Sequence, residues 1–284
     1  MLDQTQGAPV AAASPAKVAP KGAGGRRWRP SPAFGRGILG MVLFLAFLEV
    51  APRVGLVNPA YLPPFSDMLN ALSQQVATGG FWTALGQTLR GWAIGFSVAM
   101  VAGVTLGIVI GTIPWLRAVT SSTIEFLRPI PSVALIPLAV LLFGIDMKAT
   151  LVLVIYASFW QVLVQVLYGV QDVDPVARET ARSYRFRQVT QVRTVVWPTA
   201  LPYVMTGLRL AASVALILEL TGELIIGSPG LGNLIGTAQS AGAVATMYGL
   251  VIVSGLLGVL MNGLARATQA RVLRWHPSVR GELA

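Results

Sequence analysis

Residues 91–113 read GWAIGFSVAMVAGVTLGIVIGTI, a stretch without a single charged side chain. At 1.5 Å per residue, about 20 residues are enough to cross the roughly 30 Å hydrocarbon core of a bilayer. Small residues recur here at every fourth position: Gly91, Gly95, Ala99, Gly103, Gly107 and Gly111. This spacing puts them on one face of a helix, where another helix backbone can approach closely. We expect a membrane-spanning helix whose small-residue stripe serves helix packing.

Five further apolar stretches approach the same length. Together with 92–113, the predicted spans are 37–57, 123–143, 149–170, 203–226 and 247–266. The stretch 123–143 is interrupted by Glu125, Arg128, Pro129, Pro131 and Pro137, which leaves Ser132–Phe143 as its only clean run. A broken or kinked helix buried among others tolerates such residues, whereas a lipid-facing helix does not. The predicted fold is an all-α polytopic membrane bundle of about six transmembrane helices.

The composition agrees with this fold class. The chain is 54% hydrophobic and 11% charged, with a mean hydropathy of +0.68, whereas soluble domains carry roughly 25% charged residues. A net charge of +10 raises the question of nucleic-acid binding. The charges lie between the apolar stretches and accompany no nucleic-acid-binding motif, so they indicate membrane topology instead. We expect membrane lipid, and no nucleic acid, around this protein.

The distribution of basic residues predicts the orientation. Residues 1–36, rich in Ala, Pro, Gly and Ser, are expected to form a disordered cytoplasmic tail before a membrane domain over 37–270, and residues 271–284 a second cytoplasmic tail. If the first tail is inside, 16 of the 21 Lys and Arg residues fall in inner segments. We therefore predict a multi-pass protein of the cell membrane with both termini cytoplasmic. A signal peptide is the alternative for the first apolar stretch, but no small-residue cleavage site is evident.

Two connections are expected to be structured on the outer side. Ser66 can cap a short interfacial helix that continues through Gln75 and ends before Gly79-Gly80. The stretch 227–233 is dense in turn residues but flanked by apolar ones, which favours a structured re-entrant or interfacial turn.

Polar side chains inside the predicted spans are candidates for a translocation path. An ionisable group in lipid costs roughly 3 kcal/mol on insertion scales, so it normally faces protein or water. The candidates are Ser132, Gln161, Gln165, Glu219 and Glu223. Hydrogen bonding between helices is the alternative for the two glutamines, and capping of a neighbouring element is the alternative for Glu223.

Catalytic groups are missing from the sequence. Each of the lysines, Lys17, Lys21 and Lys148, lacks the preceding glycine of a phosphate-binding loop. The chain has no cysteine, and its one histidine, His276, lies in the polar C-terminal segment. We expect no catalytic residue, no metal site and no bound cofactor, so any ATP must be hydrolysed by another chain.

The segment 172–200 differs from a generic basic linker. Asp172, Asp174 and Pro175 can begin a helix, and Val176–Val189 then reads as a short helix outside the membrane. Pro198 and Pro202 are expected to redirect the chain into the fifth span. A short exposed helix at this place is suited to docking on a partner.

In this segment the sequence resembles the permease subunits of binding-protein-dependent ABC importers. The hallmark of that family is Glu-Ala-Ala, three residues, Gly, nine residues, Ile, one residue and Leu-Pro. The chain has Glu179-Thr180-Ala181, Arg185 at the Gly position, Val195 at the Ile position and Trp197-Pro198. The family's Gly permits a tight turn between two short helices, so Arg185 leaves the geometry of this turn open.

The resemblance extends over roughly 60–275, and it is strongest to permeases for aliphatic sulfonates, taurine, nitrate and related small anions. It is carried by Arg128-Pro129-Ile130-Pro131, Phe143-Gly144, Gly169-Val170, Gly207-Leu208-Arg209, Glu223, Gly230-Leu231-Gly232 and Leu273-Arg274-Trp275. It implies a type I importer bundle, a homodimer, a separate ABC ATPase that binds ATP, and an extracytoplasmic solute-binding protein.

The resemblance also implies which residues couple the chain to the ATPase. They are Arg178, Glu179, Thr180, Ala181, Arg182, Ser183, Tyr184, Arg185 and Pro198. An ion-coupled secondary transporter that uses Glu219 and Glu223 is the alternative function.

Overall fold

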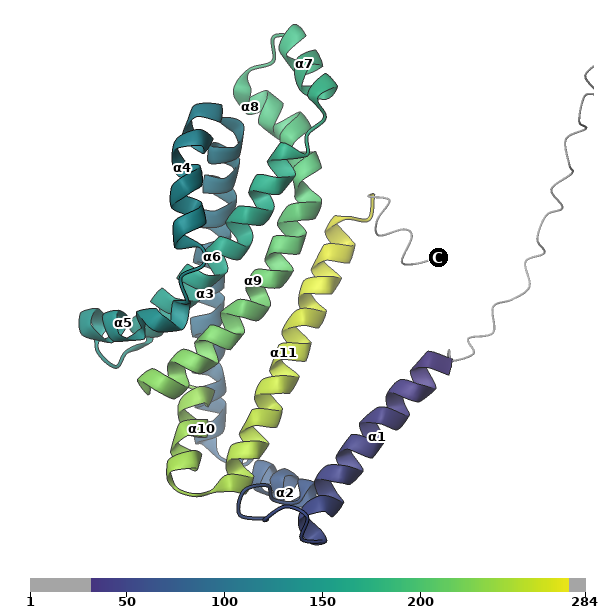
Figure 1. Ribbon diagram of the computed structural model, residues 1–284, viewed down its shortest axis with the longest axis vertical. Helices are drawn as coiled ribbons and strands as arrows, with labels where there is room; N and C mark the ends of the chain where they lie inside the picture. Colours follow the sequence, from purple (N-terminus) through teal and green to yellow (C-terminus); the bar gives the residue numbers. More distant parts are fainter. Residues whose placement is uncertain (1–31, 276–284) are drawn as a thin grey trace, which may run out of the picture. The chain divides into compact units, whose positions relative to one another are not determined.

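The computed structural model describes residues 32–275, and within this range every regular element is a helix (Figure 1). The described chain divides into two units, with the boundary between Phe44 and Leu45. The first helix, α1 (Pro32–Arg53), begins in the first unit and ends in the second. Most of the predicted N-terminal tail, and His276 in the C-terminal one, lie outside the described residues.

The second unit contains the remaining helices. They are α2 (Phe65–Val76), α3 (Gly79–Thr112), α4 (Pro114–Leu127), η1 (Ser132–Leu135), α5 (Ile136–Phe143), α6 (Met147–Gln171), α7 (Pro175–Ser183), α8 (Gln188–Gln191), η2 (Val192–Val196), α9 (Trp197–Ile226), α10 (Leu231–Ser240) and α11 (Val244–Val272). α6 makes its most extensive contacts with α9 and α3, and α11 packs against α2, α9 and α10. The core of the bundle therefore lies around α6.

Five helical stretches of the described chain are long and apolar enough to span a membrane, and a bent pair raises the number to six. The prediction of about six spans is confirmed. α3 and α11 are longer than the predicted spans 92–113 and 247–266. The expected break within the span 123–143 is also confirmed. The predicted start of this span was wrong, because its first helix, α4, begins at Pro114. α4 ends at Leu127, and the next helices leave at an angle of 84°.

Proline chemistry explains this break. Pro129 and Pro131 donate no backbone N–H, so neither can make the backbone hydrogen bond that would continue the helix. Four residues, 128–131, therefore separate α4 from η1.

The small-residue stripe of α3 is where α6 packs. A Cβ atom added to Gly103 would lie 2.7 Å from Val162 Cβ, and one added to Gly107 would lie 2.7 Å from Val166 Cβ. Ala99, in the same stripe, is fully buried. The two backbones thus approach too closely for larger side chains, and the predicted packing role of the stripe is confirmed.

The prediction that Ser66 caps α2 is wrong. Pro64 occupies the N-cap position, while the Ser66 backbone N–H and hydroxyl both donate to the Glu49 carboxylate, at 2.9 and 3.0 Å. The predicted short helix is present as α2, which ends at Val76, and Gly79-Gly80 form the first turn of α3, whose cap is Thr78. The two helices are joined by a shorter connection than the glycine pair suggested.

The loop predictions need two corrections. The expected helix Val176–Val189 ends at Ser183, and a second helix begins at Gln188. Pro198 and Pro202 do not redirect the chain, because 188–226 is one helical stretch. It accommodates Pro198 through the wider turn of η2, where the Trp197 N–H donates to the Val192 carbonyl five residues earlier.

Candidate functional site

The helix α7 lies at one end of the bundle, beyond the ends of the long helices (Figure 1). Asp174 starts it as predicted: its carboxylate accepts the Val176 N–H at 2.8 Å, and Pro175 occupies the first turn. Within α7, Ala181 is buried, whereas Glu179, Thr180 and most of the other predicted coupling residues are exposed. One short helix therefore presents most of its polar surface outward.

A tight turn follows α7. The Phe186 N–H donates to the Ala181 carbonyl at 3.0 Å, and the Arg185 N–H donates to the Arg182 carbonyl at 2.8 Å. This pair of bonds is the Schellman motif, which needs a left-handed residue at its centre, most often Gly. Arg185 supplies that conformation with φ +54°. A tight turn after α7 thus forms with an arginine, and not a glycine, at the left-handed position.

Apolar side chains are exposed around this turn. Tyr184 is 74% exposed, Phe186 42% and Val189 79%, and the Tyr184 and Phe186 ring centroids are 6.3 Å apart. Tyr184 was among the predicted coupling residues, whereas Phe186 and Val189 were not. Their exposure could have been predicted, because a short helix outside the membrane offers Phe186 and Val189 no other helix to pack against.

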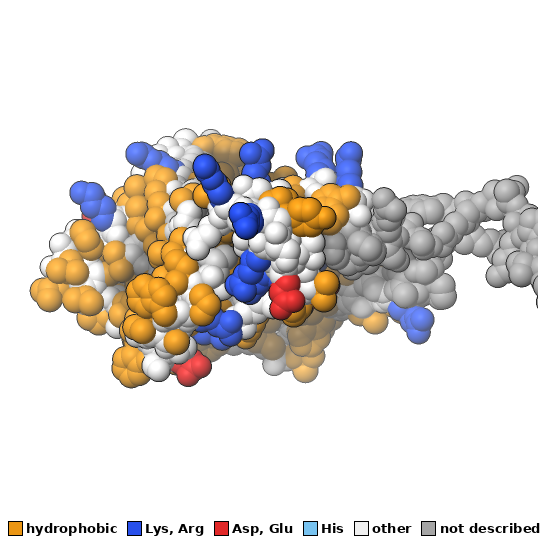
Figure 2. Space-filling view, turned by 90° about the horizontal axis from the view of Figure 1, so that it is seen from above, with side chains coloured by type: hydrophobic (Ala, Val, Ile, Leu, Met, Phe, Trp, Pro, Cys, Tyr) orange, Lys and Arg blue, Asp and Glu red, His pale blue; other side chains and the backbone are white. Residues whose placement is uncertain are grey.

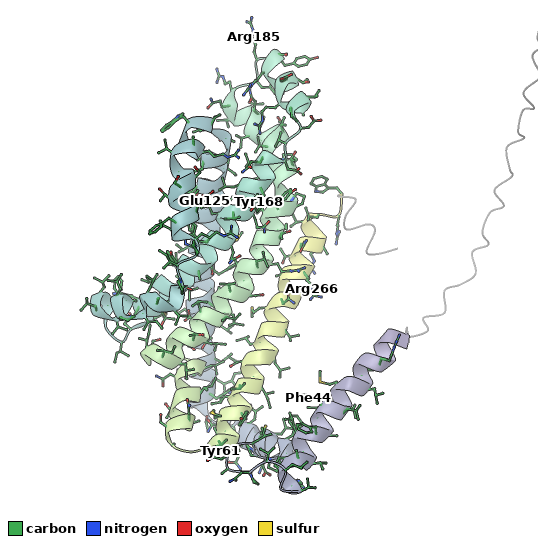
Figure 3. The ribbon with its side chains drawn as sticks, viewed as in Figure 1. Phe44, Tyr61, Glu125, Tyr168, Arg185 and Arg266 are labelled. Carbon is green, nitrogen blue, oxygen red and sulfur yellow. The ribbon has the colours of Figure 1, made fainter. Side chains whose placement is uncertain are left out.

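Basic side chains dominate the same end of the molecule. Figure 2, which looks onto this end, shows many Lys and Arg side chains and few acidic ones. Figure 3 shows Arg185 at the tip of the loop, directed away from the bundle. Pro198 lies apart from this surface, in a cavity of about 540 Å³ lined also by Asp172, Tyr203 and Trp275.

A buried polar cluster lies near the opposite end of the bundle. The Glu223 carboxylate accepts the Thr88 hydroxyl at 2.7 Å and the Gly232 N–H at 2.8 Å. The Thr88 hydroxyl oxygen also accepts the Leu231 N–H at 2.9 Å. Glu223 and Thr88 together satisfy the first N–H groups of α10, which supports the capping interpretation of Glu223. The predicted structured turn at 227–233 is confirmed, since Asn233 donates to the Gly227 carbonyl at 2.6 Å.

The other path candidates do not come together on one surface. Glu219 is 1% exposed, and its Oε2 atom has no hydrogen-bond partner. Gln161 and Gln165 are half-buried beside α9, where a Cβ on Gly207 would meet Gln165 Cβ at 3.2 Å. Ser132 begins η1, outside this cluster. Their role in a translocation path stays a prediction.

Comparison with known proteins adds a family match. Residues 103–274 match the family described as "Binding-protein-dependent transport system inner membrane component". The taurine transport system permease protein of Escherichia coli (strain K12) is 30% identical over 244 residues, covering 84% of this chain and 88% of the relative. A putative aliphatic sulfonates transport permease protein of Bacillus subtilis (strain 168) is 25% identical, covering 87% and 89%.

Two further matches bear on solute and fold. A nitrate import permease protein of Leptolyngbya laminosa is 26% identical, covering 69% of this chain and 70% of the relative. A solved bacterial ABC transporter involved in the import of the acidic polysaccharide alginate superposes with a TM-score of 0.60 at 12% identity, covering 84% of this chain and 96% of that one. The bundle is therefore that of a known transporter fold.

Proposed function

This chain belongs to the family of inner membrane components of binding-protein-dependent transport systems, and from that membership we propose that it imports a small solute with an oxyanion group, such as a sulfonate, taurine or nitrate. The resemblance found in the sequence is confirmed. The chain is the membrane permease subunit of an ABC importer, and ATP is hydrolysed by a separate ATPase subunit. Permeases of this kind work with an ATPase and a periplasmic binding protein.

The names of the relatives support a solute with an oxyanion group. They refer to taurine, aliphatic sulfonates and nitrate, and these solutes share a compact oxyanion group. Which of them this chain carries follows from its binding protein. Isolating the binding protein that co-purifies with the chain, and identifying its ligand by mass spectrometry, tests this part of the proposal. A neutral sugar as the ligand would contradict it.

Coupling is assigned to α7 and the turn that follows it. Two copies of the chain form the translocation path, and the α7 helix of each copy docks into a cleft of one ATPase subunit on the cytoplasmic side. The observation that carries this assignment is the exposed face of α7: Glu179, Thr180 and Ser183 point outward, while Ala181 anchors the helix. A surface helix with so few contacts of its own moves readily with a docked partner.

The charge of Glu179 provides the test. We expect Glu179→Lys to lower ATP-dependent uptake into vesicles about tenfold or more, the equivalent of roughly 1.4 kcal/mol of docking free energy. Insertion into the membrane should be unchanged, because the side chain is exposed. Uptake of taurine and of nitrate is measured with the ATPase and the binding protein present.

The matched control is Asp67→Lys, the same charge reversal at an exposed position of α2, outside both the loop and the predicted spans. It should retain wild-type uptake. Wild-type uptake by Glu179→Lys would contradict the docking role of α7. Uptake driven by a proton gradient alone, without any ATPase, would instead favour the ion-coupled carrier.

A further inference from the structure

A cavity of about 520 Å³ lies between the α3–α4 corner and the coupling loop. Its inner wall is apolar and includes Ile108, Ile113, Val192, Val195 and Val196. Its polar lining consists mainly of arginine and glutamine side chains: Arg117, Arg178, Arg182, Gln188 and Gln191. Within the described part of the chain, no Asp or Glu lines it. An apolar pocket with a cationic rim suits an anionic amphiphile.

The guanidinium groups of this rim have neutral acceptors. Arg117 Nη2 donates to the Gln171 side-chain oxygen at 2.9 Å, and Arg178 Nη2 donates to the Val170 carbonyl at 3.0 Å. Within the part of the chain that the structure describes, neither Arg117 nor Arg178 nor Arg182 forms an ion pair with a carboxylate. Each guanidinium carries five N–H donors, so most donors of the rim remain available for an anion.

The surroundings place this cavity at the depth of lipid headgroups. On α3, Val101, Leu106 and Val109 are 67%, 45% and 45% exposed, as expected of a lipid-facing surface. At the α3–α4 corner Trp115 is 68% exposed, and tryptophan is enriched where the membrane core meets water. The apolar wall of the cavity and the lipid-facing surface of α3 share Val109.

We propose that this cavity binds the phosphate group of an anionic phospholipid, held by Arg117 and Arg182, with the adjoining glycerol and acyl carbons against the apolar wall. Guanidinium groups bind phosphate through paired N–H donors. Basic pockets between membrane helices on the cytoplasmic side bind acidic headgroups. Arg178, Ala181 and Arg182 belong to α7 and also line the cavity. Given the coupling role proposed above for α7, the bound lipid therefore ties that helix to the membrane surface.

The purified full chain in detergent provides the test. Native mass spectrometry records bound lipid during titration with phosphatidylglycerol or phosphatidylcholine. We expect at least a tenfold preference for phosphatidylglycerol, and a loss of roughly tenfold or more in its affinity in Arg117→Gln/Arg182→Gln. The charge-matched control is Arg187→Gln/Arg193→Gln, two exposed loop arginines that do not line the cavity. The control pair should bind phosphatidylglycerol like the wild type.

Three outcomes would overturn the proposal. One is equal phosphatidylglycerol binding by both arginine pairs, provided that all variants elute and melt like the wild type. The second is displacement of phosphatidylglycerol by an equal concentration of inorganic phosphate, which would make a free anion the ligand. The third is protection of Arg117 from a guanidine-modifying reagent by the partner ATPase but not by phosphatidylglycerol. Lipid binding is measured without nucleotide, so failure of the coupling role would leave this result unaffected.

Discussion

Arg185 holds the turn after α7 in a conformation that glycine adopts at no steric cost. Among residues 32–275 it is the one residue other than glycine with a positive φ, at +54°. A left-handed conformation costs a residue with a Cβ roughly 1–2 kcal/mol. Two backbone hydrogen bonds of the turn depend on it. The loop therefore retains its shape with an arginine at its tip, where the side chain is accessible to a partner.

Substitution at this position separates shape from charge. We expect Arg185→Gly to keep the turn and ATP-dependent uptake, since glycine favours this conformation. Arg185→Val should weaken uptake, because a β-branched residue is a genuine outlier there and destabilises the turn by about 1–2 kcal/mol. Hydrogen exchange of the amides at 184–187 reports the turn directly.

The control is Arg187→Val, which removes the same charge at a position with φ −61° and ψ 151°, where valine fits. Exchange rates for Arg185→Val equal to those of the control would disprove the steric argument.

Glu219 and Glu223 were both candidates for the translocation path, but the structure gives their carboxylates different hydrogen-bond partners. Glu223 accepts hydrogen bonds from Thr88 and Gly232, whereas Glu219 Oε2 has no partner. We expect Glu223→Gln to lower the free energy of unfolding by about 1–3 kcal/mol, because the amide NH2 group would replace one of the two carboxylate oxygens that accept hydrogen bonds from Thr88 and Gly232. Glu219→Gln should change it by less than about 0.5 kcal/mol. Thermal melting in detergent measures both, and equal losses would contradict the assignment of Glu223 as the cap.

The contact between α3 and α6 is set by the small-residue stripe. We expect Gly103→Ala to destabilise the bundle by about 1–3 kcal/mol, because the added methyl group would overlap Val162 on α6. Gly86→Ala in the same helix is the control. No heavy atom lies within 4 Å of its added Cβ, so it should be neutral or stabilise α3 by up to about 1 kcal/mol. Unfolding of both variants in detergent compares them, and equal destabilisation would disprove the packing argument.

Helices marked by a regular spacing of small residues or by capping residues could be predicted from the sequence, whereas the geometry of the break between α4 and η1 could not. The stripe of α3 and the exposed α7 could be predicted because spacing and capping are local properties. The direction of the bend at 128–131 could not, since it depends on contacts distant in the chain: the Tyr156 hydroxyl of α6 donates to the Leu127 carbonyl at 2.6 Å, and Ala139 of α5 is buried in the cluster around α6. Glu223 was ambiguous for the same reason, because its partners come from α3 and α10.

At the scale of the whole molecule, the two ends of the bundle differ in chemistry. The coupling loop and the start of α4 lie at one end, and α2 and the α10–α11 connection lie at the other (Figure 1). The arginines of the cavity belong to the first end, because Arg117 is in the first turn of α4 and Arg178 and Arg182 are in α7. The proposals for ATPase docking and for an anionic lipid both require the first end to be cytoplasmic. The positive-inside distribution of Lys and Arg supports this orientation.

Single-cysteine labelling tests this orientation, and it needs no background correction because the chain contains no cysteine. Ser183→Cys lies at the end of α7, and Ala241→Cys lies in the connection after α10; both positions are exposed. We expect a membrane-impermeant maleimide to label Ala241→Cys in intact cells, or in spheroplasts where an outer membrane is present. Ser183→Cys should be labelled only after the membrane is opened. The reverse pattern would place α7 outside, where no ATPase and no cytoplasmic-leaflet lipid can reach it, and both proposals would then be wrong.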